Sequence, residues 1–297
     1  MNGFARIRWS SIAGAVFFSA FVLALSRFWV PEEIRQVLKA ALLALTAAVL
    51  VSRYAVGFQG GVARFRVSRA SSRGFVWSAM SIQPVEVFGA QRFVATLVLG
   101  FLRQLAGRAA PEPPHGEAFR YWRTSTYPAA AVVLAICLVI ELPVGALLMK
   151  GLGMAEAKRE LLHEALLVLT TWVFVLGIGD RYWLKAGAHV LDAAHLHLQL
   201  GARVRGAVPL RLVTGALVQP RRAKGRSSLV KERILEVSPL DSPNLRLLLA
   251  PEALSNVRVR GAPVPDPVEV LDLRVDEPER LLAALAARGV PAGASRS

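Results

Sequence analysis

Four long apolar runs, separated by charged segments, constrain this fold more than any other feature of the chain. The runs are Ser10–Val30, Val37–Ser52, Thr126–Met149 and Leu161–Gly179. A helix needs about 20 consecutive apolar residues to cross the hydrocarbon core of a bilayer. Hydrophobic residues make up 54% of the chain, so part of this apolar surface must face lipid. We therefore predict an α-helical integral membrane protein with about four spans in two hairpins.

The first run has a second interpretation. Arg6 and Arg8 precede its apolar core, and Ala24–Ser26 loosely fits a cleavage site, as in a signal peptide. The second run follows closely, however, and this favours a helical hairpin. That second run is slightly short, and Lys39 near its start would have to extend toward the membrane surface.

Charged and aromatic residues around the runs indicate the topology. Tyr121 and Trp122 precede the third run, and Tyr182 and Trp183 follow the fourth, where interfacial anchors belong. The segment between the second and third runs carries ten basic and three acidic residues, whereas the other connections are short and nearly balanced. Because basic loops stay on the cytoplasmic side, we expect both termini there. Only six of the 36 basic residues are lysine, and Ala, Leu and Gly are abundant, which suggests a GC-rich coding sequence and therefore a bacterial inner membrane.

These features divide the chain into five parts. They are a first hairpin (1–55), a basic cytoplasmic segment (56–125), a second hairpin (126–180), a soluble β domain (181–290) and a flexible tail (291–297). The single cysteine, Cys137, lies within the third run. Neither a disulfide framework nor a cysteine-based metal cluster is therefore expected.

The basic cytoplasmic segment opens with alternating residues. The run 60–69 predicts a strand that presents Arg64, Arg66 and Arg69 outward, in a short hairpin with residues 74–80.

A second apolar stretch follows within the same segment. In residues 85–108 the uncharged part between Arg92 and Arg103 is too short to span a membrane, which predicts an amphipathic helix at the interface. Residues 110–117 are rich in Pro and predict a turn-rich linker back to the membrane.

After Asp180 the pattern changes from helical periodicity to alternation. Residues 194–218 predict two or three strands, separated by Gly201 and by Gly206–Pro209. Further strands are predicted within 233–239, 244–250, 257–261 and 268–275. The domain is therefore expected to be an antiparallel β domain.

One helix closes this domain in the prediction. It begins at Pro278 and ends at Gly289, with Leu281, Leu282 and Leu285 on one apolar face. The motifs SPLDSPNLRLLLAPE and LDLRVDEPERLLAAL, after a hairpin leading into VPL, resemble a bacterial pleckstrin-homology-like domain over about residues 186–289. The resemblance implies a bent antiparallel sheet capped by a C-terminal helix. It also implies a module that binds partners or oligomerises.

Glu141 is the most informative residue of the membrane half. An ionisable side chain deep within a span is costly and marks a candidate functional site. With a rise of 1.5 Å per residue, an antiparallel fourth helix reaches the same depth near Thr170 and Thr171, which could form hydrogen bonds with Glu141. The three interpretations are a residue that fixes helix packing beside Pro143, a proton or ion relay, and a contact with a partner chain.

Two further groups of residues are candidates for binding. His195 and His197 alternate on one strand and could ligate a metal with His189 or Asp192, although solvated surface histidines are the alternative.

The second group is basic and could dock on anionic lipid, where each basic residue contributes about 1 kcal/mol. It combines Arg64, Arg66 and Arg69 with the loop residues Arg221, Arg222, Lys224 and Arg226.

The predicted function is a membrane-anchored scaffold that recruits or assembles protein partners, or copies of itself, at the cytoplasmic membrane face. The alternative is a subunit of an oligomeric channel or transporter that uses Glu141. No cofactor is expected, and no catalytic motif is found: His163-Glu164 lacks the second histidine of a zinc-protease motif, because Leu167 stands there. The net charge of +15 alone would suit nucleic acid, but no recognition helix accompanies it.

Overall fold

A computed structural model describes residues 30–70, 75, 78, 82–151, 156–219, 230–231, 233–264 and 268–292. Apart from Val30, the first predicted span lies outside these residues, and so does its interpretation as a signal peptide. The predicted basic loop of Arg221, Arg222, Lys224 and Arg226 also lies outside them. The chain forms two compact units, Met1–Gly89 and Ala90–Ser297, which we describe separately.

The described part of the first unit consists mainly of helix α2, which runs from Glu32 to Ala70 without interruption. The strand predicted at residues 60–69 is therefore wrong. An isolated strand leaves its backbone groups unpaired, whereas a helix that continues out of an apolar run pairs them locally and needs no new nucleus. A Cβ at Gly61 would overlap the carbonyl of Ile82, so glycine at this position lets the helix pack closely against the following segment.

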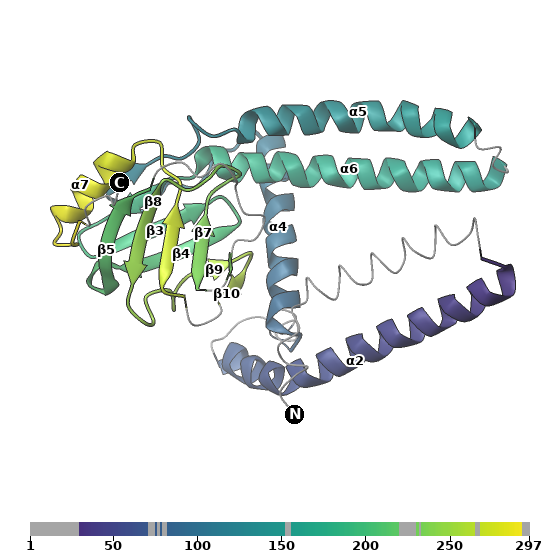
Figure 1. Ribbon diagram of the computed structural model, residues 1–297, viewed down its shortest axis with the longest axis horizontal. Coiled ribbons are helices and arrows are strands. Elements are labelled where there is room, and N and C mark those ends of the chain that lie inside the picture. The colour runs from purple at the N-terminus through teal and green to yellow at the C-terminus, as the bar shows by residue number, and fades with distance from the viewer. Residues whose placement is uncertain are drawn as a thin grey trace. The chain divides into compact units, whose positions relative to one another are not determined.

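Three described helices are long and apolar enough to cross a membrane: the Glu32–Ser52 part of α2, α5 (Tyr127–Gly151) and α6 (Glu156–Ala186). Helices α5 and α6 lie side by side as an antiparallel hairpin (Figure 1). The third and fourth apolar runs are thus confirmed as helices. Helix α6 continues past Asp180, the predicted boundary, and its last turns belong to the packed base of the β domain.

Helix α4 (Val85–Leu105) confirms the helix predicted before the linker. Within the second unit, its Leu97 packs against Tyr182 and Trp183 at the end of α6. Leu99, Leu102 and Leu105 recur every three residues and are exposed. An apolar exposed stripe is compatible with the predicted place at a membrane interface, which stays a prediction.

The β domain contains two sheets. The six-stranded sheet has the order β1-β2-β3-β4-β9-β10, and the five-stranded sheet has the order β5-β8-β11-β7-β6. All pairs are antiparallel except β7 with β11, which is parallel. The strands of the first sheet are β1 (Glu117–Phe119), β2 (His189–Leu191), β3 (His195–Leu200), β4 (Val204–Pro209), β9 (Arg258–Val259) and β10 (Ala262–Pro263). Those of the second are β5 (Val213–Val218), β6 (Val230–Lys231), β7 (Ile234–Val237), β8 (Leu245–Leu249) and β11 (Val270–Leu273).

Strand β1 was not predicted, because it precedes the hairpin and begins at the last residue of the predicted linker, 110–117. Glu117 pairs with Leu191 and Phe119 with His189 in the antiparallel register of β1 and β2. The domain therefore takes one edge strand from before α5 and the rest from after α6. The hairpin is an insertion into the β domain and not merely a preceding anchor.

Alternation along the strands builds the domain core. Leu196, Leu198 and Leu200 of β3 are all buried, because alternate residues of a strand share one face. The expected break at Gly206–Pro209 is wrong, because β4 runs through Gly206 and pairs with β3 as far as Pro209. Cross-strand pairing to β3 continues to satisfy the backbone there.

Helix α7 (Pro278–Ala286) caps the domain beside β5, as predicted, and buries Leu281 and Leu285. Gly289 follows in a left-handed conformation with φ of 83°. The chain does not become a free tail at residue 291, because the Pro291 carbonyl accepts a hydrogen bond from the Ala216 N–H. Residues 293–297 lie outside the described part.

Candidate functional site at the junction of the hairpin and the β domain

A buried polar network joins the hairpin to the β domain. Arg203, in the turn between β3 and β4, forms a salt bridge of 2.5 Å with Asp180 of α6. The hydroxyl of Tyr127, at the start of α5, donates to the same carboxylate at 2.7 Å. A second arm of the guanidinium donates to the Pro239 carbonyl at 2.8 Å. Both hairpin helices and two loops of the domain therefore meet at one ion pair.

The start of α5 is held from the domain side as well. The Thr126 N–H donates to the Asp241 carboxylate at 3.0 Å, and Asp276 accepts hydrogen bonds from the Thr124 N–H and hydroxyl. Acidic groups at a helix N-terminus satisfy its free N–H groups and complement its dipole. Burial alone would raise the pKa of Asp241, but hydrogen bonds from Ser125 and Thr126 bring it below its usual value.

Of the four aromatic residues predicted as interfacial anchors, Tyr121, Tyr182 and Trp183 are buried in this junction, and Trp122 is half-buried. Tyr121 is fully buried, and its hydroxyl accepts a hydrogen bond from the Gly201 N–H at 3.1 Å. Trp183 donates from Nε1 to the Thr96 carbonyl at 2.7 Å, and Arg205 lies 4.6 Å above its ring. A tyrosine or tryptophan buried at a junction needs a hydrogen-bond partner for its polar atom, as one at a membrane interface does. The two situations therefore give the same residue types at the end of an apolar helix.

A large open groove lies beside the network, with a volume of about 1020 Å³. Its apolar wall comes from α4, α5 and α6, and includes Phe93, Leu97, Leu134, Leu138 and Phe174. Its opposite end belongs to the β domain and contains Arg203, Glu236, Ser238, Pro239, Leu240 and Arg260, with Asp180 and Arg181 of α6 nearby. The groove is therefore apolar along the hairpin and cationic at the domain.

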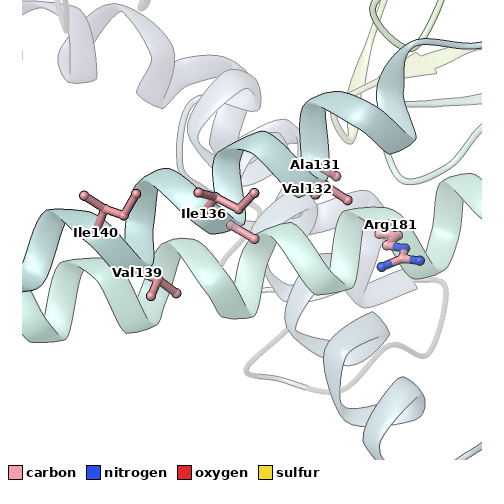
Figure 2. A pocket seen from close by; sticks show the side chains of 7 residues that line it. Ala131, Val132, Ile136, Val139, Ile140 and Arg181 are labelled. Carbon is pink, nitrogen blue, oxygen red and sulfur yellow. The ribbon is translucent and has the colours of Figure 1, made fainter.

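A second, smaller groove of about 350 Å³ follows α5 (Figure 2). Figure 2 shows Val132, Ile136 and Ile140 along α5, with Arg181 of α6 at one end of the row. Ala131, Ala135 and Arg181 line both grooves, so the two adjoin. Arg181 is thus shared by two apolar surfaces.

The structure does not pair Glu141 with either predicted threonine. Glu141 and Thr171 are exposed, whereas Thr170 is buried and its hydroxyl has no hydrogen-bond partner. The rise per residue fixes the height of these side chains along the helices. It does not fix the direction in which they point, which depends on the rotation of each helix about its axis. Cys137, four residues before Glu141, is exposed too, so the two residues share an outward face of α5.

The three candidate histidines do not form a metal site. His197 Nε2 lies 2.7 Å from Asp192 Oδ2, which lowers the pKa of that carboxyl to about 2. Cross-strand partners share a face, and Val190 pairs with His197, so His189 lies on the opposite face. In the described parts of the chain, no group of three His, Cys, Asp or Glu side chains could hold a metal ion.

His189 instead belongs to the domain core and predicts a pH-dependent stability. It is fully buried beside Tyr121, with ring centroids 5.2 Å apart, and burial lowers its pKa from 6.5 to about 4. The unfolded chain binds a proton near pH 6.5, whereas the folded chain does so only near pH 4. We therefore expect the free energy of unfolding to fall by about 3 kcal/mol in total as the pH drops through this window.

Thermal unfolding of the purified protein at several pH values between 7.5 and 4 checks this expectation. A His189→Gln variant should lose much of the pH dependence, since glutamine does not titrate and can still accept from the Gln199 N–H. His195→Gln, at a half-exposed position, is the matched control and should keep it. Superimposable pH profiles for wild type and His189→Gln would contradict the assignment.

The predicted membrane-surface arginines are only partly described. Arg66 and Arg69 are exposed on α2, three residues apart, on one helix face. Arg64 is half-buried and donates to the Gln83 carbonyl at 2.7 Å. Lipid docking by this face stays a prediction.

The sequence reasoning missed Tyr127, Asp180 and Arg203 as a group, and Arg181 and Arg260 as the cations of the groove. A usable signal was present in Asp180, an acidic residue directly after a predicted span, which needs a partner if the helix continues. Arg203 could not be assigned to it, because the contact depends on how β3 and β4 fold back onto α6.

The fold and the junction together define a class of protein: a hairpin of two helices apolar enough to cross a membrane, inserted into a two-sheet β domain and locked to it by a buried ion pair. Comparisons with protein families, curated proteins and solved structures found no match. Function therefore has to be argued from the site itself.

Proposed function

We propose that this protein is a membrane-anchored scaffold that assembles with partner chains, or with further copies of itself, at the cytoplasmic face of a bacterial inner membrane. In this proposal the chain has four spans in two hairpins, both termini are cytoplasmic, and the β domain acts as a pleckstrin-homology-like binding module. The single observation that carries the proposal is the outward position of Glu141 on α5.

Glu141 lies ten residues before the end of α5 at Gly151, or roughly 15 Å along the axis. A carboxyl at this depth costs several kcal/mol if it faces lipid, and such residues almost always face protein or water. Neither Thr170 nor any other described side chain forms an ion pair or hydrogen bond with Glu141. A partner helix packed on this face would supply the missing polar contact.

The junction supports the same proposal from the domain side. The ion pair of Asp180 and Arg203, and the strand pairing of β1 with β2, fix the domain relative to α5 and α6. A domain fixed in this way presents its surfaces at a constant height and orientation above the hairpin. Such a geometry suits a scaffold, whose partners have to be held in register.

Cys137 provides a direct test, because it is the only cysteine of the chain and lies one turn from Glu141 on the exposed face. We expect mild oxidation of native membranes to give a disulfide-linked dimer if the partner is a second copy. A photoactivatable reagent attached to Cys137 should give a product of different mass if the partner is another membrane protein. Mass spectrometry identifies either product.

The matched variants separate a specific contact from chance collision. Glu141→Gln keeps the hydrogen-bonding groups and should crosslink like the wild type, whereas Glu141→Leu should reduce the product several-fold, because interhelical hydrogen bonds contribute about 1 kcal/mol in membranes. Cys137→Ser abolishes the thiol chemistry and is the blank. Absence of any adduct with both reagents, in a protein that sediments as a monomer, would overturn the proposal.

The same outward carboxyl favours a second candidate function, a subunit of an oligomeric channel or transporter in which Glu141 faces a shared pathway. The two candidates differ in whether ions move. Ion flux into liposomes that is absent, or is unchanged by Glu141→Gln, removes the second candidate and leaves the scaffold.

A further inference from the structure

We propose that the large groove at the junction is a binding site for one anionic phospholipid. The phosphate would lie at Arg181 and Arg260, and the acyl chains would lie along the apolar walls of α5 and α6. This inference is independent of the proposed scaffold function, because a lipid can occupy the groove whether or not a partner chain covers Glu141.

The groove contains arginines that have no counter-ion among the described residues. Arg203 also lines the groove, but its guanidinium is already neutralised by Asp180. Arg181 and Arg260 are exposed, and within the described residues neither side chain has an ion pair or hydrogen bond. The other acidic group of the lining, Glu236, is buried and has its own interaction. Two free positive charges therefore face the groove.

Arg260 has an unusual backbone conformation. Arg260 and Gly261 form the turn between β9 and β10, both with positive φ, of 49° and 81°. Turns of this type favour Asn, Asp or Gly at the first position, and a long side chain there costs on the order of 1 kcal/mol. The Arg260 N–H donates to the Arg203 carbonyl and so keeps the turn beside the ion pair. The strained turn thus keeps an arginine at the cationic end.

The shape of the groove points to a lipid. Leu134, Leu138 and Phe174 line the groove along helices that can cross a membrane, where acyl chains would be available to fill it. Arg181 lies where these helices reach the β domain, at the level expected for headgroups, and it is shared by the adjoining groove along α5 (Figure 2). Two apolar grooves that meet at one arginine match two acyl chains that meet at one phosphate.

The rim of the groove fits the same occupant. Leu240, next to Pro239 on the domain side, is 51% exposed and would otherwise present a bare apolar side chain to water. A soluble phosphate compound would use the arginines but leave this rim and the helical walls uncovered. An anionic phospholipid covers both, and a zwitterionic one would bring an extra positive charge to two arginines.

Lipid binding to the purified full-length protein in a neutral detergent tests the proposal. Phosphatidylglycerol and phosphatidylcholine with identical acyl chains are compared by native mass spectrometry and by thermal shift. We expect phosphatidylglycerol to bind at least several-fold more tightly. Arg181→Gln and Arg260→Gln should each weaken it by about tenfold, the value of one charge-assisted hydrogen bond, and Arg181→Lys should recover part of the loss.

Two control variants and competition by glycerol phosphate keep the test decisive. Arg211→Gln removes an exposed arginine that does not line the groove, and it should bind phosphatidylglycerol like the wild type. Ala135→Trp fills the apolar part of both grooves and should weaken binding without any change in charge. Equal affinity for the two lipids, wild-type binding by both glutamine variants, or equally strong competition by glycerol phosphate would each overturn a specific anionic-lipid site.

Discussion

Replacement of Asp180 by alanine is expected to destabilise the second unit by about 3 kcal/mol, because it leaves the half-buried Arg203 guanidinium without its counter-ion. Arg203 keeps only its hydrogen bond to the Pro239 carbonyl, and the Tyr127 hydroxyl loses its acceptor. The effect should be a large drop in the melting temperature of the purified protein. The β domain should also become sensitive to protease at its connection to α6.

The control for this prediction is an ion pair of the same chemistry on the surface. Arg233 and Glu269 are 64% and 48% exposed, so Glu269→Ala should cost less than about 1 kcal/mol. Combining Asp180→Leu with Arg203→Met removes both charges and should be less harmful than Asp180→Ala alone. If Asp180→Ala melts like Glu269→Ala, the buried pair does not hold the hairpin to the domain.

The second large effect is expected at Gly179, where α6 crosses α4. A Cβ there would overlap the carbonyl of Leu97, and a Cβ at Gly100 would lie 2.5 Å from Nε1 of Trp183. Small residues let membrane helices approach to backbone contact. Gly179→Leu should therefore force α4 away from α6 and break the hydrogen bond from Trp183 to the Thr96 carbonyl.

Limited trypsin digestion detects this separation, because the hydroxyl of Tyr182 holds the Arg108 carbonyl at 3.1 Å in the wild type. We expect cleavage after Arg108 to become about tenfold faster in Gly179→Leu. This factor corresponds to a free energy of local opening that is lower by about 1.4 kcal/mol. Gly177→Ala is the matched control, since a Cβ at Gly177 meets nothing within 4 Å. Equal digestion of the two variants would show that the crossing tolerates a side chain.

Local patterns predicted those parts of this protein whose physics is local. Apolar runs of sufficient length predicted α5 and α6, because lipid selects helices with all backbone groups paired within the segment. Alternation along residues 195–200 predicted a strand, which is β3, and Pro278 predicted the start of α7, since its fixed φ suits a first helical turn.

Sequence patterns of only a few residues gave the wrong secondary structure where a neighbouring helix or strand determined it. The alternation at residues 60–69 fits a strand, yet α2 propagates through it because no partner strand is available within the described part of its unit. Residues 110–117 resembled a linker and no strand was predicted after them, yet Glu117–Phe119 forms β1 because the edge of β2 offers unpaired backbone groups.

The sequence by itself determined where the helices and most strands lie, which residues are apolar enough for lipid, and that Glu141 lies well inside a long apolar segment. Only the tertiary structure decided that Glu141 faces outward, that His189 lies in the core away from His197, and that Asp180 meets Arg203. These outcomes depend on helix rotation, strand register and contacts between residues far apart in the chain. Such contacts arise when elements pack, and packing between distant segments leaves no periodic mark on either one.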